Sequence, residues 1–137
     1  MNALDARTLI PQRDPFVLVD ELLDADTTRI RTSFRVPAEH VLFDGRNLRE
    51  GALLENMAQS IAAGQGFLAR QQGSDVSKGF IGAIKKIHIE RLPEAGELLH
   101  TEAEMLHEIG DARIAAARVF SGDRLLASAE FTIFVSS

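Results

Sequence analysis

A long apolar segment without proline constrains the fold of this chain more than any other feature. Residues 52–70 are rich in alanine, leucine and methionine, which favour a helix. The apolar residues are spread around most of the expected helix rather than along one stripe: Leu53, Leu54, Met57, Ala58, Ile61, Ala62, Phe67 and Leu68. Such a helix is buried on most sides, so the rest of the chain must wrap around it. Gly64 and Gly66 are expected to weaken its last turns.

Segments with the pattern of β-strands lie on both sides of this helix. A short β-favouring run occupies residues 16–19, and residues 29–36 alternate with period two, which places Ile30, Phe34 and Val36 on a core face. Residues 40–51 are expected to form a loop. Four further strands, separated by short turns that favour antiparallel hairpins, are predicted after the helix: 80–91, 97–108, 112–120 and 125–135.

One long helix with five or six antiparallel strands predicts an α+β architecture in which the sheet wraps around the helix. This arrangement is the hot-dog fold, and we expect a single domain over residues 1–137. That length is enough to bury a core without disulfides or metal. A ferredoxin-like sandwich would need a second long helix, and no other segment has that pattern.

Composition excludes several classes of function. A formal charge of −5 argues against general affinity for nucleic acid, which needs a basic surface. The chain has no cysteine, so thiolate chemistry and cysteine-based zinc sites are ruled out, and the spacing of the histidines predicts no metal site. We find neither a phosphate-binding glycine motif nor a serine nucleophile elbow. Without an apolar run long enough for a membrane span or a signal peptide, a cytoplasmic protein is expected.

A carboxylate inside the apolar helix is the first candidate for chemistry. Glu55 lies between leucine and methionine residues, and Gln59 follows one turn later on the same face, where it can donate to a carboxylate or a thioester oxygen. Burial would raise the pKa of such a carboxyl group, as acid–base catalysis often requires. The alternative is that both residues line a dimer seam or a partly solvated helix face.

Other polar residues give weaker signals. His40 is the one histidine in a predicted loop, directly before the helix, and loops often carry functional groups. The alternative is an exposed histidine that merely titrates near neutral pH. Lys85, Lys86 and Arg91 offer positive charge to an acidic carrier or a coenzyme phosphate, or else form the solvated face of a strand.

Four motifs carry a resemblance to a known family. Residues 9–20, Leu-Ile-Pro-Gln-Arg-Asp-Pro-Phe-Val-Leu-Val-Asp, and residues 54–59, Leu-Glu-Asn-Met-Ala-Gln, are similar to the opening and helix motifs of the 3-hydroxyacyl-[acyl-carrier-protein] dehydratases of type II fatty-acid synthesis. Residues 80–84 and 93–97 resemble a strand and a turn of the same family. The resemblance covers nearly the whole chain, and it is closer still to a divergent branch that accompanies aryl polyene and flexirubin-type pathways.

The resemblance implies a function and a set of site residues. In that family a helix carboxylate, here Glu55, works with a loop histidine from the partner subunit. Leu42 stands where that histidine is expected, and His40 lies two residues earlier. The first hypothesis is therefore a 3-hydroxyacyl-thioester dehydratase in which His40 removes the α-proton and Glu55 assists departure of the hydroxyl. Gln59 and the backbone near Gly51 would bind substrate, and Gly82 would allow close approach of the thioester.

The same resemblance leaves other functions open. One is a non-catalytic subunit that binds acyl carrier protein or completes a heterodimer with an active dehydratase, and another is an acyl thioesterase. In each case no cofactor is expected beyond the substrate's own carrier, the phosphopantetheine of an acyl carrier protein or coenzyme A. The expected assembly is a homodimer or a heterodimer with another hot-dog subunit.

Overall fold

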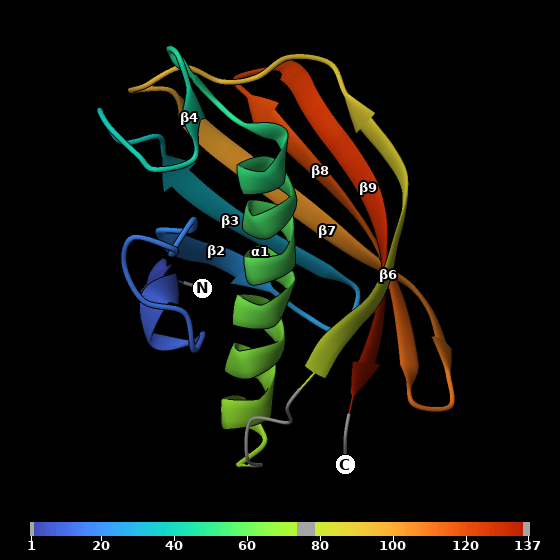
Figure 1. Ribbon diagram of the computed structural model, residues 1–137. Helices are drawn as coiled ribbons and strands as arrows, with labels where there is room; N and C mark the ends of the chain where they lie inside the picture. Colours follow the sequence, from blue (N-terminus) through green and yellow to red (C-terminus); the bar gives the residue numbers. More distant parts are fainter. Residues whose placement is uncertain (1, 74–78, 136–137) are drawn as a thin grey trace.

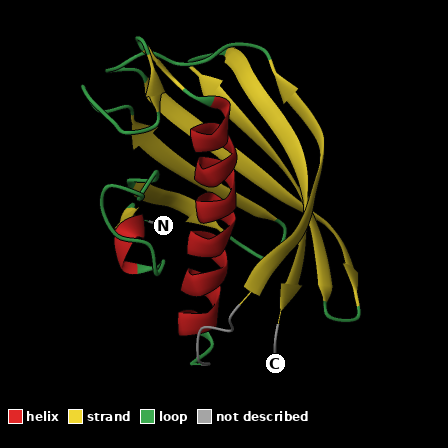
Figure 2. Ribbon diagram, in the orientation of Figure 1, coloured by secondary structure: helices red, strands yellow, loops and turns green. Residues whose placement is uncertain are grey.

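The computed structural model describes residues 2–73 and 79–135. Helix α1 (Glu50–Gln71) crosses the concave face of an antiparallel sheet that, in the described part of the chain, has seven strands (Figures 1 and 2). The order across the sheet is β1-β2-β3-β7-β8-β9-β6. These strands are β1 (Leu4–Asp5), β2 (Glu21–Ala25), β3 (Arg29–Arg35), β6 (Gly79–Ile89), β7 (Leu98–Ile109), β8 (Ala112–Ser121) and β9 (Arg124–Val135). A 3-10 helix, η1 (Ala6–Thr8), and a small hairpin of β4 (Phe43–Asp44) and β5 (Asn47–Leu48) complete the described elements.

The predicted α+β hot-dog architecture is confirmed, with more strands than the five or six expected. The four strands after the helix match their predicted bounds to within two residues, and the helix begins two residues earlier than predicted. Ile30, Phe34 and Val36 are buried as expected. The sequence pattern missed two strands at one end of the sheet, β1 and β2, because β1 has only two residues and β2 carries acidic residues that obscure its alternation.

The strand predicted over residues 16–19 is wrong. Leu18 N–H donates to Gln59 Oε1 at 2.8 Å, and Leu18 O accepts from Asn56 Nδ2 at 2.6 Å. The backbone of this segment is therefore satisfied by side chains of α1 rather than by a neighbouring strand, so it is extended without joining the sheet. The expected loop over residues 40–51 also contains the β4–β5 hairpin, which turns at Gly45 with a φ of 65°.

The glycines expected to weaken the helix instead bring it close to its neighbours. A Cβ atom at Gly64 would collide with the side chain of Ile30 on β3, and one at Gly66 would lie 2.9 Å from Leu9 O. The helix therefore continues to Gln71, because close packing at these two positions offsets the weak helix propensity of glycine.

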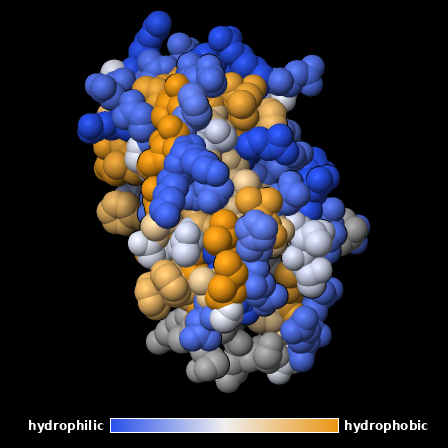
Figure 3. All heavy atoms as spheres, turned by 90° about the vertical axis from the view of Figure 1, so that its right-hand side faces the viewer, coloured by the Kyte–Doolittle hydropathy of each residue, from blue (hydrophilic) through white to orange (hydrophobic). Residues whose placement is uncertain are grey.

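Strand β6 forms an exposed edge of the sheet. It is eleven residues long and lies at the right of Figure 1, where only β9 pairs with it. Phe80, Ile81 and Ile87 are 64%, 41% and 48% exposed. Apolar side chains gather in patches on this side of the molecule (Figure 3). A long apolar edge strand is a ready surface for pairing with another chain.

Candidate active site

A groove of about 800 Å³ runs along the side of α1 that the sheet leaves uncovered. The helix forms its floor, residues 8–13 form one wall, and the start of β6 forms the other. Its apolar lining is Ala58, Ile61, Ala62, Phe80, Ile81 and Ile133. Glu55 and Gln59 lie among these residues. The expectation that the helix is buried on most sides is therefore wrong for this side, and Glu55 is exposed in the single chain.

Glu55 is held in place by Gln59, as the spacing of the two residues predicts. Gln59 Nε2 donates to Glu55 Oε2 at 3.0 Å and also to Phe16 O at 2.8 Å, while Gln59 Oε1 accepts from Leu18 N–H. An amide has only two N–H donors, so both are used within the chain. Gln59 is also only 1% exposed. In this geometry Gln59 fixes the position of Glu55 and leaves no N–H to donate to a substrate.

Sequence reasoning missed a buried polar cluster directly beneath this pair. Asn56 is 1% exposed, and its Oδ1 accepts from Thr101 Oγ1 on β7 at 2.5 Å. Ser60 Oγ donates to Asn56 O at 2.7 Å and lies 2.7 Å from Thr32 Oγ1. These bonds tie the first half of α1 to β3 and β7 and fix the rotation of the helix. The signal in the sequence was Asn56 itself, a second polar residue in the middle of an apolar run.

His40 lies against the segment that Gln59 holds, but no hydrogen bond joins it to Glu55. Its Nε2 is 2.5 Å from Pro15 O, and its Nδ1 accepts from Leu42 N–H at 3.0 Å. Because Nδ1 is an acceptor, the proton is on Nε2, which donates to Pro15 O. Both ring nitrogens are therefore engaged within the chain.

The two candidate glycines differ in their surroundings. Gly51 is exposed in the first turn of α1, with open space around the position of a Cβ atom. Ala52 and Leu53 donate their N–H groups to Arg49 O, so within the described residues the N–H groups of Glu50 and Gly51 are the free donors at the helix start.

Gly82 is close to an aromatic ring rather than to the groove. A Cβ atom there would collide with the ring of Phe134, which stacks on Phe80 with the ring centroids 5.7 Å apart. Gly82 thus makes room for this ring pair. It is not one of the described residues that line the groove.

Two of the three basic residues singled out in the sequence are paired within the chain. Lys86 Nζ lies 3.4 Å from Glu130 Oε2. Arg91 makes two hydrogen bonds to Glu97, at 2.5 and 3.1 Å, and these bonds chiefly lower the pKa of Glu97 to about 2. Glu97 also accepts from Glu94 N–H and Ser121 Oγ, so it organises the turn before β7.

Comparison with known proteins decides the family. A family model described as ApeP dehydratase (ApeP-like) matches residues 4–137. This chain belongs to the ApeP-like dehydratase family. Among curated proteins, this ApeP-like chain is 31% identical over 130 residues to the 3-hydroxyacyl-[acyl-carrier-protein] dehydratase FabZ of Thermus thermophilus, covering 90% of the chain and 89% of the relative. It is 27% identical to FabZ of Shewanella woodyi, covering 95% and 91%.

Solved structures agree on the fold of the ApeP-like chain. The dehydratase heterocomplex ApeI:P from Xenorhabdus doucetiae matches with a TM-score of 0.87 at 15% identity, covering 98% of this chain and 92% of that one. A hypothetical thioesterase with coenzyme A from Streptococcus pneumoniae matches with a TM-score of 0.68 at 17% identity, covering 85% and 84%.

The described part of the ApeP-like chain holds neither a cluster of metal-binding side chains nor a helix suited to spanning a bilayer. Within residues 2–73 and 79–135, no group of three or more histidine, aspartate or glutamate side chains is placed to hold a metal ion. The single long helix in those ranges is not apolar enough to cross a bilayer.

Proposed function

We propose that this chain is one subunit of a paired hot-dog dehydratase that removes water from 3-hydroxyacyl thioesters, with Glu55 as the acid. The observation that carries the proposal is the carboxyl group of Glu55, held by Gln59 beside an apolar groove large enough for an acyl chain. Membership of the ApeP-like family and the FabZ relatives support this class of reaction. The substrate would be carried on the phosphopantetheine of an acyl carrier protein or on coenzyme A, in the cytoplasm.

In the proposed reaction, a base takes a proton from C2 of the acyl chain and the released electron pair forms the C2=C3 double bond. The C3–O bond breaks, and the hydroxyl leaves as water with a proton from Glu55. The thioester oxygen gains negative charge during this step. We assign the free N–H groups of Glu50 and Gly51 to that oxygen, because the start of a helix stabilises developing negative charge. The product is a 2-enoyl thioester, and proton exchange with solvent restores the acid and the base.

The identity of the base that removes the C2 proton differs from the first hypothesis, which assigned that role to His40. His40 would have to give up its bonds to Pro15 and Leu42 before it could accept a proton from substrate. We therefore assign proton removal to a group of the paired subunit and give His40 the role of anchoring Pro15. Phe16, the next residue, accepts from Gln59, so this anchor also supports the pair that includes Glu55.

Pairing with a second hot-dog chain is supported by the surface of the subunit. The apolar residues of β6 and the exposed groove adjoin each other, since Phe80 and Ile81 belong to both. A partner that added its own edge strand to β6 would cover the groove and remove Glu55 from bulk water. The matching structure is itself described as the dehydratase heterocomplex ApeI:P, which supports an unlike partner.

The second candidate is a non-catalytic subunit, and the engaged ring of His40 is the observation that favours it. Dehydration of 3-hydroxyacyl thioesters by the paired assembly separates the two candidates. We expect Glu55→Gln to lower kcat/KM by a factor of about 10² to 10⁴, the usual contribution of a general acid. Glu104→Gln, an exposed carboxylate on β7, is the matched control and should leave the rate unchanged.

Three outcomes would change the assignment. Full activity of Glu55→Gln in the assembly would show that this subunit is non-catalytic. A loss with His40→Ala as large as that with Glu55→Gln, in a variant of unchanged stability, would restore His40 as the base. Release of free thiol without formation of an enoyl product would identify a thioesterase.

A further inference from the structure

A second cavity lies next to the groove, at the C-terminal end of α1. It has a volume of about 500 Å³ and opens between the helix and the ends of β7, β8 and β9. Its apolar lining includes Ile30, Leu68, Met105, Leu106 and Val135. Polar side chains make up most of the rest of the wall. Its open rim carries the ion pair of Glu108 with Arg113, at 2.7 Å. Nothing in the proposed reaction uses this cavity.

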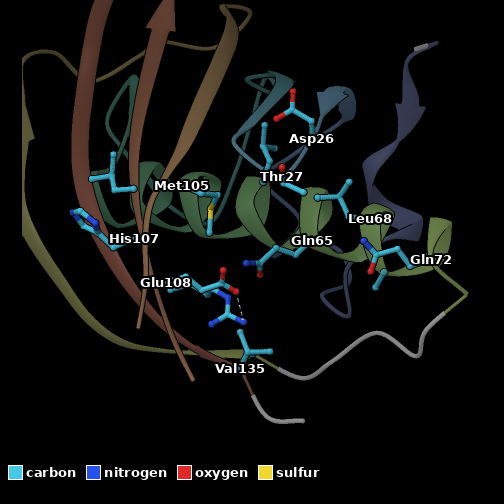
Figure 4. A pocket seen from close by; sticks show the side chains of 14 residues that line it. Asp26, Thr27, Gln65, Leu68, Gln72, Met105, His107, Glu108 and Val135 are labelled. Carbon is cyan, nitrogen blue, oxygen red and sulfur yellow. Dashed lines mark ion pairs between the residues drawn. The ribbon is translucent and has the colours of Figure 1, made fainter. Parts of the chain in front are cut away.

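Gln65 lies at the boundary between the groove and the second cavity. Gln65 and Gly79 line both spaces, so the two spaces adjoin each other at these residues. Figure 4 shows Gln65 projecting from the helix into the second cavity, toward Met105 and Glu108. Among the described residues its side-chain amide makes no hydrogen bond, so it can change rotamer without breaking one. Gly79, the other residue that lines both spaces, has no side chain.

We propose that acyl chains longer than about fourteen carbons pass Gln65 into the second cavity, and that Gln65 sets the chain-length preference of the site. This inference rests on the proposed function, since it takes Glu55 as the position of the reacting carbons. In this inference the groove holds the acyl chain and not the phosphopantetheine arm of the carrier.

The length follows from the helix. Gln65 lies ten residues after Glu55, and a helix rises about 1.5 Å per residue, which separates the two by about 15 Å along the axis. A fully extended chain advances about 1.2 Å per bond, as in a peptide backbone that covers about 3.5 Å in three bonds. From C2 beside Glu55, the chain therefore reaches Gln65 after about twelve bonds, which is about the fourteenth carbon of the acyl group.

The lining identifies the occupant. Between Glu55 and Gln65 the helix presents Ala58, Ile61 and Ala62 to the groove, and these apolar side chains suit methylene groups. The second cavity continues with Ile30, Leu68 and Met105 beyond Gln65. An acyl chain thus meets apolar side chains on both sides of the boundary.

Binding of saturated acyl thioesters to the paired assembly tests this inference without turnover, because these ligands have no 3-hydroxyl to lose. Calorimetry would use acyl-coenzyme A of graded length, from about ten to about twenty carbons, around the expected boundary. In the unaltered protein, affinity should rise by up to about fourfold per added methylene over the whole series. In Gln65→Phe, which blocks the boundary, the rise should stop at about fourteen carbons.

Two controls keep the outcome interpretable. Gln65→Ala opens the boundary and should keep the full rise with length. Gln71→Phe places the same ring on an exposed position of the same helix and should match the unaltered protein. An identical plateau in the unaltered protein and Gln65→Phe would overturn the inference. So would a uniform loss at every length, because the groove would then hold the carrier arm.

Failure of the proposed reaction would leave a different pattern. If the assembly formed no enoyl product while Gln65→Phe still shortened the preferred acyl chain, the acyl path would stand and the assignment of Glu55 as acid would fall. If dehydration occurred but acyl length had no effect past Gln65, the assignment of Glu55 as acid would stand and the acyl path past Gln65 would fall.

Discussion

Replacing Gln59 with leucine tests whether the side-chain amide of Gln59 holds the site together. The substitution keeps the approximate size of the side chain but removes three hydrogen bonds, to Glu55, Phe16 and Leu18. Leu18 N–H is buried and would lose its acceptor, at a cost of about 1–3 kcal/mol. Phe16 O is partly buried and would cost less, so we expect a total loss of about 2–4 kcal/mol in the free energy of unfolding.

For a chain of this size, about 3 kcal/mol corresponds to a fall in Tm of roughly 10 °C. Thermal and denaturant unfolding of the paired assembly at fixed concentration would measure it. Activity should fall as well, because Glu55 loses the donor that orients it. Gln71→Leu makes the same chemical change on an exposed turn of α1 and serves as the control. Equal stability of Gln59→Leu and Gln71→Leu would refute the reasoning.

Two further predictions concern stability. Glu97→Gln should remove up to about 3 kcal/mol at neutral pH, because Arg91 holds the pKa of Glu97 near 2 instead of its usual 4.5. Since the folded-state pKa is lowered, this stabilisation is complete above about pH 4.5 and disappears toward pH 2. In denaturation measured at several pH values, the free energy of unfolding of the variant should therefore fall less between about pH 4.5 and pH 2 than that of the unaltered protein. Gly64→Ala should destabilise by about 1–3 kcal/mol through its collision with Ile30, despite better helix propensity. Gly51→Ala, in open space, should be neutral or slightly stabilising, and the same sign for both alanine variants in denaturant titrations would contradict the packing argument.

Periodicity and propensity predicted most of the fold because those signals are local. The strands after the helix follow an alternating pattern that tertiary contacts reinforce, and their bounds were nearly correct. The segment over residues 16–19 has the same apolar character, yet its backbone bonds go to Asn56 and Gln59, far away in the sequence. No pattern within the segment could reveal that competition.

The site was predicted in part for the same reason. The pairing of Glu55 with Gln59 follows from helical spacing, which the sequence displays directly. The contact of His40 with Pro15 joins two loops, and the burial of Asn56 against Thr101 depends on how the sheet curves. These contacts are set by the tertiary structure, so the sequence indicated the residues without indicating their partners.

The exposed edge of β6 has a consequence for how a cell must make this protein. A subunit whose apolar edge is covered only by a partner has a stability that depends on how much partner is present. Chains made in excess would expose Phe80 and Ile87 to other strands and to proteases. With an unlike partner, balanced synthesis of the two chains would therefore set the amount of working assembly.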